Sequence, residues 1–214
     1  MGLNLKKLIN KSGIKYVDPQ EFVSVEFDYP VYTDLTVLHY NKKKNGQTAT
    51  KNVFYNNPED FESNFMEYAK VSNLYIACHF WDNKAPFIFS RADARHKDFN
   101  IEYVADVSCD IDGPVASTLR PSTIADPFYG YDPATEKEVA HSLPKSIGVM
   151  AVDNLPCELP RDASVDFGRD LIDHVIPHLF NGDPEKVIWR ASETQHGKLM
   201  PHFEYLQAYV NGEE

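Results

Sequence analysis

The sequence has few of the features that secreted, membrane-spanning or nucleic-acid-binding proteins need. Cysteine occurs only three times in 214 residues, an odd number that argues against a disulfide framework. Every apolar run is shorter than the roughly 18 residues that span a bilayer, and Asn4, Lys6 and Lys7 interrupt the place of a signal peptide's apolar core. The net charge of -11 repels nucleic acid and anionic lipid. We expect a reduced, cytoplasmic protein that binds neither.

A metal-binding pattern is also lacking. Zinc ligands are usually paired two to four residues apart, and neither Cys109 nor Cys157 has such a partner. Cys78 and Cys109 lie at predicted strand ends inside apolar runs, where cysteine behaves as a small hydrophobic residue, so we expect them to line a crevice without acting as nucleophiles. His79 is the better candidate for a polar functional residue in this crevice. The alternative is a histidine that only forms a hydrogen bond in the crevice wall. We predict no catalytic residue.

Apolar patterning predicts the main elements. Runs of the kind found in strands buried on both faces of a parallel sheet occupy residues 74–78, 103–105 and 147–152. A shorter strand is expected over residues 14–17, ended by Asp18-Pro19. Helices are expected over residues 3–12, 57–71 and 160–180, the last distorted near its end by Pro177.

Strands that alternate with helices or long crossovers predict an α/β protein with a doubly wound, Rossmann-like parallel sheet. Residues 1–159 would form a partial nucleotide-binding domain with surface excursions, and residues 160–214 a C-terminal helical segment. None of the ten glycines forms a G-x-G-x-x-G loop after a strand, and that loop supplies the amide donors for a pyrophosphate. The domain is therefore expected to be N-terminally truncated.

Ligands of open parallel sheets bind past the carboxyl ends of the strands. Asp18 has the position of an acid that binds the adenosine ribose, although Asp before Pro is more often a turn former. The stiff segment Asp153-Asn154-Leu155-Pro156 should follow a central strand and border the same crevice as Val107 and Ser108. The alternative is that this segment only caps the helix that starts near Pro160.

Four motifs in order resemble the lysine-ketoglutarate reductase and saccharopine dehydrogenase family, which shares its fold with alanine dehydrogenase and the nicotinamide nucleotide transhydrogenases. These motifs are Ala77-Cys78-His79-Phe80-Trp81 with Ala85-Pro86, Val104-Ala105-Asp106-Val107-Ser108-Cys109-Asp110, Ser122-Thr123-Ile124-Ala125-Asp126-Pro127-Phe128, and Val152-Asp153-Asn154-Leu155-Pro156 through Leu159-Pro160-Arg161-Asp162-Ala163-Ser164.

The resemblance implies hydride transfer between NAD or NADP and the C–N bond that joins lysine to 2-oxoglutarate in saccharopine. It assigns Val107, Ser108 and the segment Asp153-Asn154-Leu155-Pro156 to the nicotinamide side, Cys78 to the adenosine side and Asp18 to the ribose. It also implies that residues 127–144 cross the sheet surface and that residues 202–210 form a helix against a second domain. The family's glycine loop and its catalytic lysine and histidine would precede Met1.

Three hypotheses follow. The first is the cofactor-binding half of such an oxidoreductase, completed by a separate N-terminal half polypeptide or working as a homo-oligomer, with lysine, 2-oxoglutarate and saccharopine as substrates. The second is a non-enzymatic binding or regulatory module that keeps the fold. The third, a small enzyme with another chemistry, is disfavoured because no nucleophile with a base and no metal set is visible.

Overall fold

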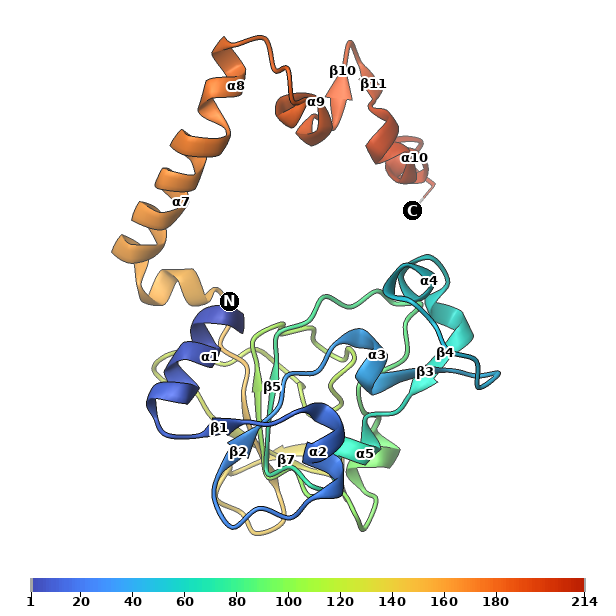
Figure 1. The fold of residues 1–214 in the computed structure, drawn as a ribbon, viewed down its shortest axis with the longest axis vertical. Coiled ribbons are helices and arrows are strands. Elements are labelled where there is room, and N and C mark those ends of the chain that lie inside the picture. Colours follow the sequence, from blue (N-terminus) through green and yellow to red (C-terminus); the bar gives the residue numbers. More distant parts are fainter. Residues whose placement is uncertain (1, 214) are drawn as a thin grey trace. The chain divides into compact units, whose positions relative to one another are not determined.

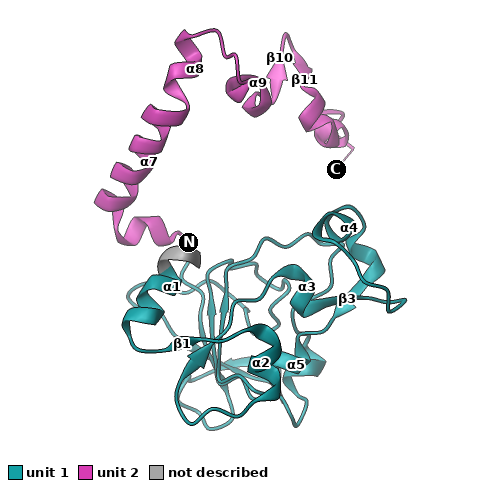
Figure 2. Ribbon diagram, in the orientation of Figure 1, with its two compact units in different colours: residues 1–153 teal, residues 154–214 magenta. Residues whose placement is uncertain are grey.

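The computed structural model describes residues 2–213 and divides them into two compact units, one ending at Asp153 and one beginning at Asn154 (Figure 1, Figure 2). The boundary that the sequence predicts, after residue 159, lies inside the second unit, just before its longest helix. Each unit is described by itself.

A five-stranded mixed sheet organises the first unit. Its strands are β5 (Leu74–Ala77), β6 (Tyr103–Asp106), β7 (Tyr129–Asp132), β8 (Lys137–Val139) and β9 (Ile147–Met150). Their order is β5-β6-β9-β7-β8, with β5, β6 and β9 parallel and β7 antiparallel to both of its neighbours. An α/β protein is therefore confirmed, but the prediction of a purely parallel sheet is wrong.

The mixed character comes from the β7–β8 hairpin. The resemblance implied that residues 127–144 cross the sheet surface, whereas β7 pairs with β9 inside the sheet. Tyr129 and Tyr131 are both buried, and Gly130 lets the chain approach closely, since a Cβ there would lie 2.6 Å from the Ala140 carbonyl oxygen. That implication is therefore wrong.

The three predicted apolar strands differ in burial. In β9, Ile147, Gly148 and Val149 are buried, which confirms a central strand. β5 is instead an edge strand, and its Leu74 is 55% exposed. Full burial of residues 74–78 was therefore a wrong prediction, because an apolar run does not distinguish an edge strand from an inner one.

Short elements surround the main sheet. The helices of the first unit are α1 (Gly2–Lys11), α2 (Pro19–Ser24), α3 (Val37–Tyr40), α4 (Lys51–Asn56), the 3-10 helix η1 (Pro58–Asp60), α5 (Met66–Ala69) and α6 (Arg91–Ala94). Two strand pairs are parallel β1 (Lys15–Tyr16) with β2 (Val31–Tyr32), and antiparallel β3 (Asn41–Lys43) with β4 (Phe61–Ser63). The predicted helix at the start of the chain is confirmed as α1. The predicted strand over residues 14–17 is confirmed as β1, which pairs with β2 outside the main sheet.

A single helix over residues 57–71 is a wrong prediction, because η1, β4 and α5 divide that stretch. Ser63 explains the interruption. Its hydroxyl donates to the Ile88 carbonyl (2.7 Å) and accepts from the Phe65 amide (3.2 Å). Bonds from a serine to the main chain compete with helix hydrogen bonds, and this one reaches a residue outside the stretch.

The second unit consists of short helices and one hairpin. Its elements are η2 (Leu155–Glu158), α7 (Pro160–His174), α8 (Ile176–Phe180), α9 (Val187–Ala191), β10 (Thr194–Gln195), β11 (Lys198–Leu199), η3 (Pro201–Leu206) and α10 (Gln207–Val210). The helical stretch 160–180 and its distortion near Pro177 are confirmed, since α7 and α8 meet at Val175. The expected helix over 202–210 is η3 followed by α10.

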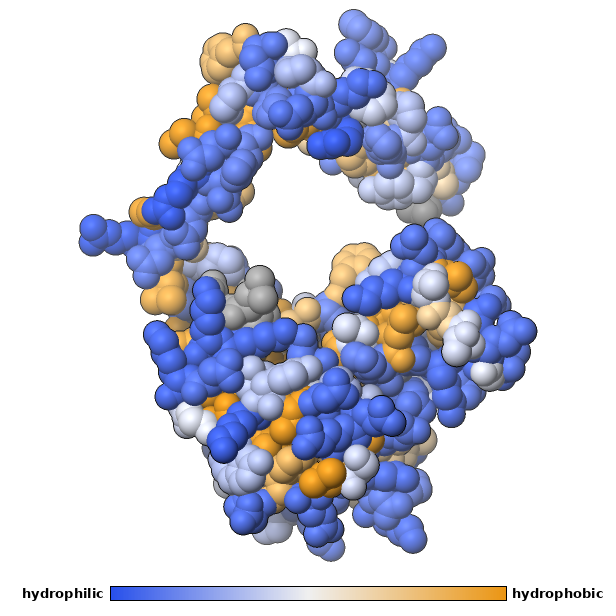
Figure 3. All heavy atoms as spheres, in the orientation of Figure 1, coloured by the Kyte–Doolittle hydropathy of each residue, from blue (hydrophilic) through white to orange (hydrophobic). Residues whose placement is uncertain are grey.

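Hydrophobic residues lie on the surface of the second unit along α7 and α8 (orange in Figure 3). Among the described residues of this unit, Met200 alone is a buried hydrophobic residue. No helix within residues 2–213 has both the length and the apolar character that a bilayer crossing requires.

Candidate functional site at the carboxyl edge of the sheet

Because β5, β6 and β9 are parallel neighbours, their carboxyl ends lie at one edge of the sheet. We call this the carboxyl edge. Cys78 follows β5, Val107 follows β6, and residues 151–153 follow β9. Three of the four resemblance motifs therefore reach the same edge, and the fourth joins it where Ser122 forms a parallel bridge with Val152.

The turn after β6 is organised by Asp106, which is 1% exposed. Its Oδ1 accepts from the amides of Ser108 (3.1 Å) and Cys109 (3.0 Å), and its Oδ2 accepts from the Thr118 hydroxyl (2.6 Å). Cys109 takes a left-handed φ of 55°, a strained conformation for a residue with a Cβ. The carboxylate thus holds the turn in a shape that the chain would not choose by itself.

Ser108 connects the ends of β5 and β6. Its hydroxyl donates to the His79 carbonyl (2.8 Å) and accepts from the His79 amide (3.1 Å), while the Val107 amide donates to the Ala77 carbonyl (2.9 Å). The Ser108 proton is therefore already engaged. Of the predicted cofactor residues, Ser108 acts here as a brace between strands, and Val107 precedes it with a half-buried side chain.

Cys109 connects the same turn to β9. Its thiol donates to the Ala151 carbonyl at 3.3 Å. Burial raises the pKa of the Cys109 thiol, and the charges of Asp106, Asp153 and Asp110 add to this effect. Asp153 thus lies close enough to act electrostatically on the turn after β6, and the thiol stays protonated, which does not suit a nucleophile.

His79 contributes a buried imidazole to the edge. Both ring nitrogens are shielded from solvent and have no hydrogen-bond partner among the described residues. Burial lowers the pKa of His79, although Asp106 and Asp110 favour its protonated form. Burial and the Asp106 charge raise the pKa of Asp110. The imidazole is therefore neutral at neutral pH.

Two predicted cofactor residues, Cys78 and Asp18, lie outside the turn after β6. Cys78 is exposed at the end of β5, and partial burial of its thiol with the Asp106 charge raises its pKa. Asp18 follows β1 and caps α2, with its Oδ1 accepting from the Gln20 amide at 3.0 Å. Its place is the junction of β1 and α2, outside the main sheet, and a helix cap accounts for its side chain.

Asn154, Leu155 and Pro156 belong to the second unit. Asn154 has a left-handed φ of 54° and precedes η2, whose first residues are Leu155 and Pro156. Asparagine tolerates this conformation better than most residues, and proline suits the first turn. The segment forms the start of a helical element, and its predicted stiffness stays a prediction.

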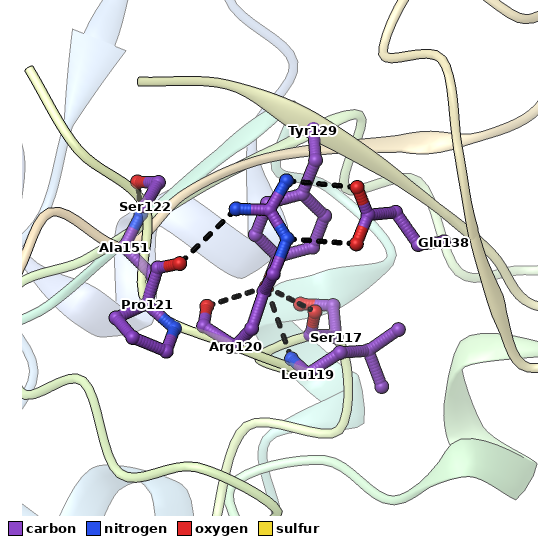
Figure 4. A network of polar contacts seen from close by, with 8 residues as sticks. All are labelled: Ser117, Leu119, Arg120, Pro121, Ser122, Tyr129, Glu138 and Ala151. Carbon is purple, nitrogen blue, oxygen red and sulfur yellow. Dashed lines mark hydrogen bonds and ion pairs between the residues drawn. The ribbon is translucent and has the colours of Figure 1, made fainter. Parts of the chain in front are cut away.

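Sequence reasoning missed a polar network around Tyr129 in β7 and Arg120, which fixes the loop that leads to Ser122 (Figure 4). The buried Tyr129 hydroxyl contacts the carbonyls of Ser117 (3.1 Å) and Arg120 (3.3 Å) and accepts from the Leu119 amide (3.0 Å). Arg120 makes two 2.8 Å bonds to Glu138 and lies over the Tyr129 ring. These contacts join residues 9 to 18 positions apart, so no local motif reveals them.

The charge of the carboxyl edge would act differently on the two ends of a dinucleotide. Asp106, Asp110 and Asp153 make it acidic, which repels a pyrophosphate, and the sequence contains no glycine loop to offset that repulsion. Carboxylates next to an oxidised, positively charged nicotinamide ring are instead attractive. Within residues 2–213 no group of three or more His, Cys, Asp or Glu is arranged to hold a metal ion.

The fold and this edge define an α/β protein with a polar, acidic site at the ends of parallel strands. No family model matches the chain. Its curated relatives are alpha-aminoadipic semialdehyde synthases: the Arabidopsis thaliana protein is 25% identical over 197 residues, and the Mus musculus mitochondrial protein 24% identical over 237 residues.

These matches cover 87% and 94% of this chain, but only 18% and 25% of the relatives. The Bos taurus mitochondrial protein is 23% identical with the same coverage as the mouse protein. The chain is therefore a distant homologue of one segment of the alpha-aminoadipic semialdehyde synthases, and it spans a quarter or less of their length.

Proposed function

We propose that this chain is the nicotinamide-side part of an oxidoreductase of the lysine-ketoglutarate reductase and saccharopine dehydrogenase type. Its coenzyme would be NAD or NADP, and hydride would pass between the coenzyme and the C–N bond of saccharopine. Sequence similarity supports the proposal. The motifs resemble that family, and the relatives that the sequence matches are named alpha-aminoadipic semialdehyde synthases.

One observation carries the proposal: the parallel order of β5, β6 and β9 gathers the motif segments at one edge. Cys78, Val107 and Asp153, which come from different motifs, follow three adjacent strands. Ligands of open α/β sheets bind at such an edge. The chain's own contribution would be to orient the nicotinamide ring against the edge and to favour its oxidised form through Asp153.

In this proposal the predicted residues have unequal roles. Val107 and Asp153 would face the nicotinamide side, and Ser108 would fix the loop that carries Val107. Asn154, Leu155 and Pro156 belong to the second unit, and their assignment to the nicotinamide side rests on the family resemblance alone. Cys78 would lie toward the adenosine side, and Asp18 would bind the ribose only if its carboxylate left the cap of α2.

Reconstitution tests the proposal. The chain would be co-expressed with a front-half polypeptide of a lysine-ketoglutarate reductase that supplies the glycine loop, lysine and histidine. The complex should reduce NAD or NADP in the presence of saccharopine, and Asp153→Ala should raise the coenzyme KM at least several-fold. Asp28→Ala, an exposed acid between α2 and β2, is the control. An equal coenzyme KM for both variants would show that Asp153 does not contribute to the coenzyme site.

The second candidate is the non-enzymatic binding module. It is favoured by the open side of β5, where Leu74 is 55% exposed and the strand is the last in the sheet. Unpaired edge strands attract further strands. A peptide that pairs with β5 while coenzymes leave the carboxyl edge unperturbed would support this candidate over the first.

A further inference from the structure

Asp106 is a buried carboxylate with no ion-pair partner within residues 2–213. Burying such a charge is costly unless hydrogen bonds satisfy it. Three donors do so here: the Ser108 and Cys109 amides and the Thr118 hydroxyl. Two of the three lie in the turn that the carboxylate shapes, so the cost is offset only when the turn is formed.

The turn after β6 connects the ends of β5 and β9 at the carboxyl edge. Ser108 bonds both main-chain polar groups of His79, after β5, and the Cys109 thiol bonds the Ala151 carbonyl, after β9. A shift of the turn would therefore disturb the ends of all three parallel strands. Asp106 sets this geometry from below the surface, since it is itself only 1% exposed.

Thr118 is the donor that comes from outside the turn. It is fully buried, and its bond to Asp106 is 2.6 Å. Its loop is fixed on one side by the Tyr129 hydroxyl (Figure 4). On the other side, the Ser122 hydroxyl accepts from the Ala151 amide at 3.0 Å, and the Ser122 amide donates to the Ala151 carbonyl at 2.8 Å. Thr118 is thus held in place independently of Asp106.

We propose that Asp106 and Thr118 are a positioning pair for the carboxyl edge. The Thr118 hydroxyl orients the Asp106 carboxylate, which in turn holds the Val107–Cys109 turn in its strained shape. Both residues are buried, so they would act on a ligand through the turn and not by direct contact. The inference rests on the proposed function as far as the ligand is concerned, and on the hydrogen bonds alone as far as the turn is concerned.

The chain offers a matched control. Thr135 donates to Asp132 Oδ2 at 2.7 Å, so it makes the same threonine–aspartate bond, but in the exposed β7–β8 turn. Thr118→Val and Thr135→Val remove one hydroxyl each and keep the side-chain shape. Thr118→Ser restores the hydroxyl and serves as the conservative rescue.

Two readouts are measured on the full chain. Amide hydrogen exchange without coenzyme should accelerate at Ser108 and Cys109 in Thr118→Val, with little change at Val149 in β9. NMR titration with NAD or NADP should show a Kd about fivefold higher for Thr118→Val, a factor that corresponds to about 1 kcal/mol. Thr118→Ser should restore both readouts, and Thr135→Val should change neither.

Uniform acceleration of exchange, or none at the turn, would overturn the inference, because Thr118 would then act only on global stability or not at all. A loosened turn with an unchanged Kd would also overturn it. If the unmodified chain shows no response to either coenzyme, the proposed function fails, and the exchange data still decide whether the pair holds the turn.

Discussion

The two units of the chain differ in how they bury hydrophobic residues. All buried hydrophobic side chains of the described residues except Met200 lie in the first unit. The longest helix of the second unit, α7, instead exposes Phe167 (68%) and Ile172 (61%). The first unit therefore has its own core, which can hold a site rigidly. The second unit has amphipathic helices whose apolar faces are not buried within that unit.

The largest contrast is expected between two phenylalanines. Phe89 is fully buried in the first unit, where its ring meets those of Phe65, Tyr75 and Phe99. Phe89→Ala should lower the free energy of unfolding by about 3–5 kcal/mol. Phe180→Ala, at a side chain that is 85% exposed, should change it by less than about 0.5 kcal/mol. Chemical denaturation measures both, and equal losses would contradict a core confined to the first unit.

A smaller contrast is expected between two tyrosines. Tyr129→Phe removes the hydroxyl that contacts the Ser117 and Arg120 carbonyls and the Leu119 amide. Buried polar groups left without partners cost about 1–3 kcal/mol. Tyr209→Phe, at an exposed ring of the second unit, should be close to neutral. The same denaturation experiment checks this, and an unaffected Tyr129→Phe variant would refute the role of Tyr129 as a brace.

The pH dependence of stability should also separate the units. Burial lowers the pKa of His79 from its ordinary value of 6.5, so the unfolded chain binds a proton that the folded chain does not bind in the window below 6.5. Stability from this residue is thus complete above about pH 6.5 and is lost as the pH falls through the lowered pKa.

His79→Gln should flatten that part of the stability curve, while His174→Gln, at an exposed position in α7, should leave it unchanged. Denaturation midpoints at a series of pH values between 4 and 8 measure the effect. If the stability of His79→Gln depends on pH in the same way as that of the unmodified protein, burial of the imidazole does not contribute to the pH dependence.

The smallest contrast concerns surface ion pairs. Arg120 and Glu138 in the first unit make two bonds of 2.8 Å, whereas Arg169 and Asp166 in α7 make one contact of 3.4 Å. Bidentate geometry favours the first pair, but both are exposed. Arg120→Gln should cost roughly 0.2–1 kcal/mol at low salt and less at high salt, and Arg169→Gln should cost nothing measurable. Equal, salt-independent losses would contradict this ranking.

Local sequence patterns predicted the elements whose cause is local. The apolar run of β9, the helix α1 with its end near Gly13, and the break between α7 and α8 at Val175, near Pro177, all follow from composition and spacing. The alternative role of Asp18 as a turn or cap residue is likewise readable from Asp before Pro, and its carboxylate caps α2.

Elements that depend on distant partners were not predictable in this way. The helix expected over residues 57–71 is interrupted because Ser63 bonds Ile88, and the bond from Thr118 to Asp106 joins a loop to the end of β6. The β7–β8 hairpin did have a local signal, the turn residues Asp132-Pro133 between two strand-like stretches. The family resemblance implied an irregular crossing of residues 127–144 instead.

Measurements on the isolated chain test what the lack of a G-x-G-x-x-G loop means for coenzyme affinity. Calorimetry with NAD(H) or NADP(H) should show no micromolar affinity, because amide donors for the pyrophosphate are lacking. Under the proposed function, saccharopine-dependent turnover by the purified chain should be undetectable, since the front half would supply the lysine and histidine that transfer protons near the C–N bond. Micromolar binding, or turnover that survives a check for contaminants by mass spectrometry, would contradict these expectations.

NMR titration of the 15N-labelled full chain with millimolar NAD or NADP tests the central claim most directly, namely that the carboxyl edge binds the nicotinamide side of the coenzyme. The account predicts weak binding, with amide shift changes concentrated at Cys78, Val107–Cys109 and Asp153, and with nicotinamide mononucleotide reproducing those at Val107 and Asp153. Shift changes confined to other surfaces, or none at saturating coenzyme, would contradict it.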